Sequence, residues 1–156
     1  MINESLDRQV NIKGRIIATI RDAKSGKVKR VYKHDNIIVT VGRTVLTRLL
    51  SGDATYSGEI TYGALGTGTT APANADTTLE TESFRKVTSS QTYSDNIAYI
   101  DFYYTATDCD GTYKEFGNFI DGEAGVDTGQ LFSKVAVDWT KSNTESLTVS
   151  CIYTIT

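Results

Sequence analysis

The sequence predicts a mainly β protein: an antiparallel β-sandwich of about eight strands with one short α-helix near residues 41–51. Of its 156 residues, 23 are threonine and nine are tyrosine, two types that favour strands, and only one is proline. Apolar and polar residues alternate with a period of two in several segments, and turn signals separate these segments. The length suits a single domain. We therefore expect one sandwich domain over residues 10–156, preceded by a flexible arm over residues 1–9.

The domain is expected to begin with a basic β-hairpin over residues 10–34. In residues 10–21 the even positions are apolar apart from Gly14, and the odd positions include asparagine, lysine and arginine. Residues 22–26 form a turn signal, in which Gly26 can supply a positive φ. A charged returning strand follows over residues 27–34. The next run, residues 36–40, is apolar on both faces and is expected to point inward.

A short helix is expected after this run. Apolar residues with helical spacing follow one another there: Val41, Val45, Leu46, Leu49 and Leu50. We expect Thr40 to cap the start of the helix and Gly52 to end it. A helix of about ten residues is not stable alone, so it should pack on the sheet.

Six further segments are expected to form strands: 59–65, 83–93, 96–107, 113–120, 130–139 and 146–155. Asp110–Gly111 and Asp121–Gly122 are typical of hairpin turns. In segment 96–107 one face is apolar, and the opposite face carries Tyr99 and Tyr103, which is unusually aromatic for a solvent face. Two interpretations remain open: this face is an interface, or the helix and the N-terminal hairpin cover it.

Charge is distributed unevenly along the chain. Residues 1–50 hold 11 of the 16 basic residues and four acids, a local net charge of +7, whereas residues 51–156 carry −10. This asymmetry suggests a partner: nucleic acid, an acidic region of another protein, or the acidic part of the next identical subunit. The alternative is that the two halves neutralise each other within one fold. Nucleic acid is the least favoured partner, because the basic residues and the aromatic residues lie in different segments.

The sequence gives no pattern for catalysis, a metal or a cofactor. His34 is the only histidine and has no triad partners nearby, and one histidine with two distant cysteines cannot form a zinc site. The glycine-rich segment 63–68 matches neither a dinucleotide fingerprint nor a P-loop, and segment 108–111 fails as an EF-hand loop. We therefore expect no enzyme. No membrane span or secretory signal is recognised, and Cys151 is expected in the core with a reduced thiol.

Two stretches resemble a known family. Residues 60–85 contain Gly66-Thr67-Gly68, a loop with Pro72, Thr77-Thr78-Leu79, Glu82 and Arg85. Residues 112–122 contain Glu115-Phe116-Gly117-Asn118-Phe119. Both stretches resemble the tail-collar fibre proteins and related small virion proteins of tailed bacteriophages. The order "Asn36 to Gly42, then a short helix" fits the same family. The chain shows no fibrous or receptor-binding extension, which favours a compact tail, collar, baseplate or neck subunit.

The resemblance implies a structural protein of the virion, assembled in the cytoplasm of the host bacterium. Its expected partners are further copies of itself and other virion proteins such as portal, tail or baseplate components. Nine residues are candidate assembly contacts: Arg15, Lys29, Arg30, Lys33, Thr67, Thr69, Arg85, Tyr99 and Tyr103. Arg85 and Glu82 are also expected to fix a loop. One alternative is a receptor- or carbohydrate-binding module of a tail or head fibre that uses Tyr99 and Tyr103. A small glycan-cleaving enzyme is the other alternative, and no residue pattern favours it.

Overall fold

The computed structural model describes residues 9–156, so most of the expected arm, residues 1–8, lies outside the described part. Nine strands and one helix follow in the order β1 (Ile12–Asp22), β2 (Val28–Ile38), α1 (Thr40–Leu50), β3 (Ile60–Gly66), β4 (Glu82–Val87), β5 (Ser90–Ser94), β6 (Ile97–Tyr104), β7 (Gly111–Ile120), β8 (Gln130–Lys141) and β9 (Glu145–Ile155). The fold is mainly β with one short helix, which confirms the predicted fold class.

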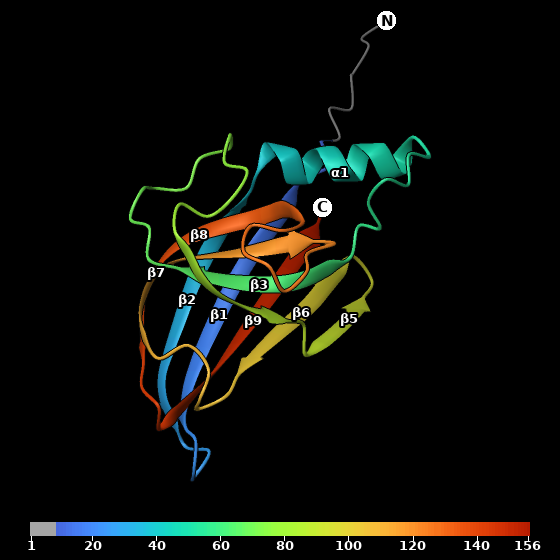
Figure 1. Ribbon diagram of the computed structural model, residues 1–156. Coiled ribbons are helices and arrows are strands. Elements are labelled where there is room, and N and C mark those ends of the chain that lie inside the picture. Colours follow the sequence, from blue (N-terminus) through green and yellow to red (C-terminus); the bar gives the residue numbers. More distant parts are fainter. Residues whose placement is uncertain (1–8) are drawn as a thin grey trace, which may run out of the picture.

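The strands form one curled antiparallel sheet, in the order β4-β3-β7-β8-β2-β1-β9-β6-β5 (Figure 1). Strand β2 links the two halves of this sheet. It pairs with β1 along most of its length and with β8 only through Ile37 and Ile38. Strands β2, β1, β9, β6 and β5 form one half, and β4, β3, β7 and β8 form the other.

The two halves are also joined where β4 continues into β5. The segment expected as one strand, residues 83–93, is split at Thr88 and Ser89. The amide of Thr88 donates to Thr61 of β3, and the amide of Ser89 donates to Asp101 of β6. The prediction of one strand was wrong. The pattern of residue types does not change at the point where the chain passes from one half of the sheet to the other, so the sequence pattern does not mark the split.

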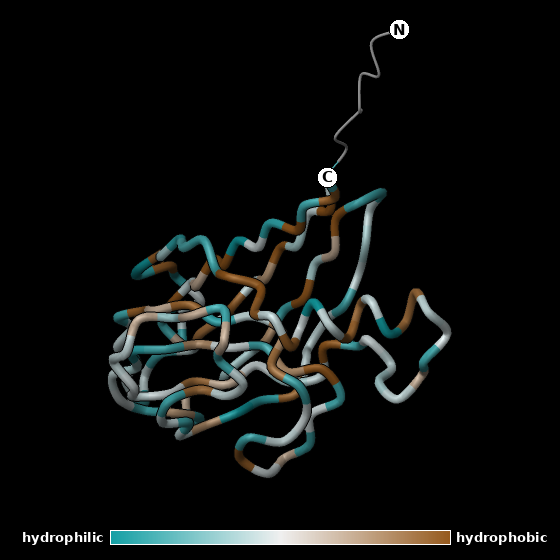
Figure 2. Tube along the Cα trace, turned by 90° about the horizontal axis from the view of Figure 1, so that it is seen from above, coloured by the Kyte–Doolittle hydropathy of each residue, from teal (hydrophilic) through white to brown (hydrophobic). Residues whose placement is uncertain are grey.

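Aromatic side chains fill the space between the two halves. Trp139, Phe102 and Tyr104 are fully buried, and Phe116 is 1% exposed. Phe102 of β6 packs edge-on against Phe116 of β7, with ring centroids 6.0 Å apart. The Tyr104 hydroxyl donates to the Gly63 carbonyl at 2.9 Å, which satisfies the one polar atom of that ring. Hydrophilic and hydrophobic residues alternate along the strands around this core (Figure 2).

The turn predictions had mixed outcomes. The N-terminal hairpin is confirmed, with Gly26 at φ +72°, although its second strand continues to Ile38. The segment around Asp121–Gly122 connects the hairpin strands β7 and β8, as predicted. Asp110–Gly111 is not a hairpin turn: it connects β6 to β7, which lie in different halves of the sheet.

Helix α1 differs from the prediction at its start. Val39 is the N-cap residue, and no side chain caps the helix; Thr40 is its first residue. The end matches the prediction. Gly52 adopts φ +81°, its amide donates to Leu49, and the next amide, of Asp53, donates to Arg48. This pair of bonds is a Schellman motif, which requires a left-handed residue.

The buried side of α1 consists of Gly42 and Val45, with Leu46 and Leu49 packed at the edge of the core. Leu50 was expected on the same side, but it is 89% exposed. Among the described residues, no helix has the length and apolar character that a membrane crossing requires.

Candidate assembly face

One broad face of the sheet is not covered by any element of residues 9–156. It is the outer side of strands β2, β1, β9, β6 and β5, which we call the outer face. Helix α1 lies across one end of the molecule (Figure 1), and the β1–β2 hairpin is part of this sheet rather than a cover over it. Tyr99 and Tyr103 on this face are 37% and 45% exposed. The structure therefore excludes the interpretation in which the helix and the hairpin bury the two tyrosines.

The strand register brings basic and aromatic side chains together on the outer face. Arg15 of β1 pairs with Ile152 of β9, which in turn pairs with Tyr99 of β6. Neighbouring strands lie about 4.8 Å apart, so Arg15 and Tyr99 are about 10 Å apart across Ile152. One row further along, Lys33 pairs with Ile17 of β1. The basic and aromatic residues, whose separation along the chain argued against nucleic acid, thus lie close together in the folded protein.

The cations of the N-terminal part are mostly unpaired within the subunit. Ten basic residues of positions 9–50 are described, and only Lys29, Arg30 and Arg48 form ion pairs. The other seven have no carboxylate oxygen within 4.0 Å among residues 9–156: Lys13, Arg15, Arg21, Lys24, Lys27, Lys33 and Arg43. All five basic residues of positions 51–156 are paired. The charge asymmetry therefore persists in the folded subunit.

Lys29 and Arg30 are the two strand residues of the basic hairpin that do find an internal partner. Both bind the buried Glu145 carboxylate, at 2.8 and 2.9 Å. The hydrogen bond from Lys29 is the largest of the effects that lower the pKa of Glu145 to about 2. Arg30 pairs with Ile20, which points into the core, so Arg30 lies on the inner side of the sheet and not on the outer face.

Thr67 and Thr69 lie elsewhere, in the exposed loop that follows β3. Glu115 of β7, only 1% exposed, anchors this loop. Its carboxylate accepts hydrogen bonds from three backbone amides, those of Gly68 at 3.2 Å, Thr81 at 2.7 Å and Glu80 at 2.9 Å. Sequence reasoning missed this role. The available signal was a charged residue at an otherwise apolar strand position.

Arg85 is buried, so its part in any interface can only be indirect. Its guanidinium forms a two-pronged ion pair with Glu82, at 2.5 and 2.8 Å, and lies 4.6 Å from the centre of the Phe119 ring. The remaining nitrogen, Nη1, donates to the Glu123 carbonyl at 2.8 Å and to the hydroxyl of Thr128 at 2.8 Å. The expected pairing of Arg85 with Glu82 is present, and the loop it holds is the one between β7 and β8.

Carboxylates gather on this loop and next to it: three are exposed, and the fourth, that of Asp121, is half-buried and accepts hydrogen bonds from the amide and hydroxyl of Ser57. We call Glu59, Asp121, Glu123 and Asp127 the acidic loop cluster. None of the four forms an ion pair within residues 9–156. The amide of Asp121 donates to the Glu59 carbonyl at 3.1 Å, which joins the two parts of the cluster. The subunit thus carries unpaired carboxylates on one side and unpaired cations on another.

His34 and Cys151, the other residues considered for chemistry from the sequence, both lie in the packed part of the fold. His34 accepts a hydrogen bond from the Trp139 indole at 3.2 Å, and burial lowers its pKa below 6.5. Cys151 is fully buried, and burial raises the pKa of its thiol to about 12. Within residues 9–156, no three His, Cys, Asp or Glu side chains lie close enough together to hold a metal ion.

Comparisons of the chain with protein-family models, with curated proteins and with solved structures give no match.

Proposed function

We propose that this protein is a non-enzymatic structural subunit of a tailed-bacteriophage particle that assembles with further copies of itself and docks to other particle proteins. The observation that carries the proposal is the outer face, where unpaired cations lie beside exposed tyrosines. Tyrosine and arginine are enriched at protein interfaces, and complementary charge steers association. The resemblance of residues 60–85 and 112–122 to small virion proteins supports the phage particle as the setting.

In this proposal the outer face of one copy meets the acidic loop cluster of the next. The outer face carries unpaired cations and the acidic loop cluster carries unpaired carboxylates, so a contact between the two is complementary in charge. A contact between two different surfaces is heterologous and produces rings or stacks. The acidic loop cluster lies near α1, since Tyr56 contacts both Arg48 of the helix and Gln130 beside the acidic loop. The tip of the basic hairpin lies at the opposite end of the molecule from α1 (Figure 1).

The test is the solution mass of the protein by light scattering at about 50 mM and about 500 mM salt. The Debye length falls from roughly 14 Å to roughly 4 Å between these conditions. We expect a discrete oligomer at low salt that dissociates at high salt. A monomer under both conditions would overturn self-assembly, and an oligomer insensitive to salt would place the interface elsewhere.

Matched variants locate the contact. Arg15→Glu with Lys33→Glu should reduce the low-salt oligomer to the species that the wild type forms at high salt. Glu123→Lys with Asp127→Lys, mixed with the first variant, should restore it, because the charges are exchanged between the two surfaces. Lys114→Glu, an exposed cation on the other half of the sheet, is the control and should leave the mass unchanged. Failure of the exchanged pair to restore association would overturn the pairing of these two surfaces.

The phage setting requires a separate experiment. Mass spectrometry of purified virions from a host that carries the gene should detect the chain in the particles. Its presence in the lysate with absence from the particles would contradict the virion proposal.

A receptor- or carbohydrate-binding module is the second candidate, favoured by the exposure of Tyr99 and Tyr103 on one face. Glycan binding that is lost in Tyr99→Ser with Tyr103→Ser, at unchanged mass, would support this candidate. Nucleic acid fits the outer face less well, because Asp101 lies between the two tyrosines on the same side of β6 and would oppose phosphate.

A further inference from the structure

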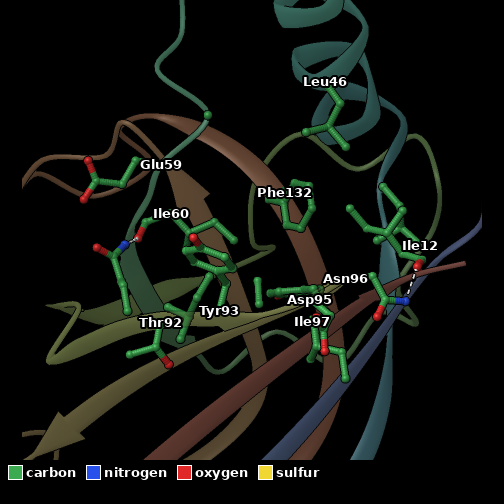
Figure 3. A pocket seen from close by; sticks show the side chains of 16 residues that line it. Ile12, Leu46, Glu59, Ile60, Thr92, Tyr93, Asp95, Asn96, Ile97 and Phe132 are labelled. Atoms are coloured by element: carbon green, nitrogen blue, oxygen red, sulfur yellow. Dashed lines mark hydrogen bonds between the residues drawn. The ribbon is translucent and has the colours of Figure 1, made fainter.

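A second surface, independent of the outer face, is an apolar groove beside helix α1. The helix crosses one end of the curled sheet and leaves two adjoining hollows of about 580 and 840 Å³, which we call together the helix groove. The hollows share Ile12, Leu46 and Ile155. Figure 3 shows the smaller one, with Leu46 pointing down from the helix toward Phe132 and Ile12.

The helix groove is lined by apolar side chains that remain open to solvent. Four of the large apolar side chains with high exposure line it: Leu50 at 89%, Tyr93 at 83%, Val10 at 76% and Ile155 at 48%. Contiguous exposed apolar surface of this kind marks an interaction site.

Polar side chains also line the groove: Glu59, Gln91, Asp95 and Asn96 in the smaller hollow, and Asn36, Arg43 and Asn74 in the larger one. Gln91 donates its amide nitrogen to the Ile60 carbonyl, and Asn96 donates to the Ile155 carbonyl, both at 2.6 Å (Figure 3). One N–H of each amide is therefore already used within the subunit. An occupant of the groove would be held mainly by apolar contacts.

The occupant is suggested by where the described chain begins. Val10 and Asn11 line the larger hollow, so residues 1–8 join the described chain at the rim of the helix groove. Their sequence contains Ile2 and Leu6, with no glycine or proline in residues 1–9. Eight extended residues span at most about 26–29 Å, which is sufficient to reach a neighbouring subunit.

The direction of the chain at this point favours a second copy over the same copy. Asn11 and Thr156 exchange two backbone hydrogen bonds, of 2.6 and 2.8 Å, which align the chain with the strand axis at the end of β1. Re-entry into the groove of the same subunit would need the chain to reverse its direction immediately before Val10. We infer that residues 1–8 of one copy bind in the helix groove of a second copy, through Ile2 and Leu6.

This inference rests on the proposed self-assembly but uses a different force, and its surface shares only Glu59 with the acidic loop cluster. Apolar association persists at high salt, whereas the contact between the outer face and the acidic loop cluster weakens. The two proposals can therefore fail separately. If both contacts exist, high salt breaks the charged contacts between subunits. It then leaves a smaller species, in which subunits are joined by residues 1–8 of one copy bound in the helix groove of another.

The first experiment measures binding of a labelled peptide of residues 1–9 to the full-length Ile2→Ser/Leu6→Ser variant, whose own segment cannot compete. We expect saturable binding at about 500 mM salt, and roughly tenfold or greater weakening when the peptide itself carries both serines. Leu50→Glu in the protein should weaken binding similarly. Val28→Glu, a 47% exposed valine at the start of β2 near the tip of the hairpin, is the matched control and should not.

The second experiment measures the mass of the full-length protein at about 500 mM salt. We expect a species larger than the monomer, which Ile2→Ser/Leu6→Ser and Leu50→Glu convert to monomer. No peptide binding, or binding unaffected by Leu50→Glu, would overturn the inference. A wild-type monomer whose groove accepts the peptide only in the Ile2→Ser/Leu6→Ser variant would overturn exchange between copies, because the segment would then occupy the groove of its own subunit.

Discussion

Replacing Arg85 by alanine removes the cation from a buried ion pair. The Glu82 side chain has no exposed surface and would remain as a charged group without its partner. Loss of one partner of a buried pair costs about 3–5 kcal/mol. The Glu123 carbonyl and Thr128 also lose their donor, but both lie near solvent and can bind water. We therefore expect the free energy of unfolding to fall by about 4 kcal/mol, and the melting temperature by roughly 8–16 °C.

The assay is urea unfolding followed by the fluorescence of Trp139, the only tryptophan, which is fully buried. The matched control is Arg48→Ala. Arg48 also pairs with a carboxylate, that of Asp53 at 2.8 Å, but the side chains are 39% and 40% exposed. This exposed pair should contribute less than about 1 kcal/mol. Equal losses in the two variants, or a loss below about 1 kcal/mol for Arg85→Ala, would refute the argument from burial.

The same variant tests the link between Arg85 and assembly. Arg85 holds the loop that carries Glu123 and Asp127, so its removal should also weaken the low-salt oligomer. Conditions must keep the variant folded, as judged by Trp139 fluorescence. Assembly at the level of the wild type in a folded Arg85→Ala protein would show that this loop needs no anchor for its contact.

Three further predictions concern the stability of the subunit. Glu145 has a pKa of about 2 in the folded state, against its usual 4.5, so its contribution to the free energy of unfolding is complete above pH 4.5 and is lost as pH falls toward 2. Glu145→Gln should remove this pH dependence from the free energy of unfolding measured in urea, a change of about 1–2 kcal/mol because Lys29 is partly exposed. His34 has a lowered pKa in the folded state, so its protonation favours the unfolded state, and the free energy of unfolding should fall as pH decreases below 6.5. His34→Gln should remove this pH dependence, and a pH dependence retained in the variant would point to another group. Gly52→Ala should lower the melting temperature by the equivalent of about 1 kcal/mol, because alanine is strained at φ +81° in the Schellman motif; no change would contradict that geometry.

Local pattern was sufficient where a single element decides the outcome. The alternation in segment 96–107 correctly placed Tyr99 and Tyr103 outward, because in any strand successive side chains point to opposite sides. Gly26 and Gly52 were correctly assigned to chain reversals, because their positive φ is a property of the local backbone. The mainly β class with one short helix followed from the same kind of evidence.

Contacts between distant segments were decided only by the tertiary structure. Arg85 binds Thr128, which lies 43 residues away, and no spacing rule connects the two. The split of β4 from β5 depends on which strand each part meets, not on its own sequence. The charge pattern shows most clearly what each level decides. A count of charged residues in the sequence is sufficient to establish that the N-terminal part is basic. Only the arrangement of the strands decided that Arg15 and Lys33 stay unpaired and share one face with the tyrosines, because strand neighbours are chosen by the packing of the core between the two halves of the sheet.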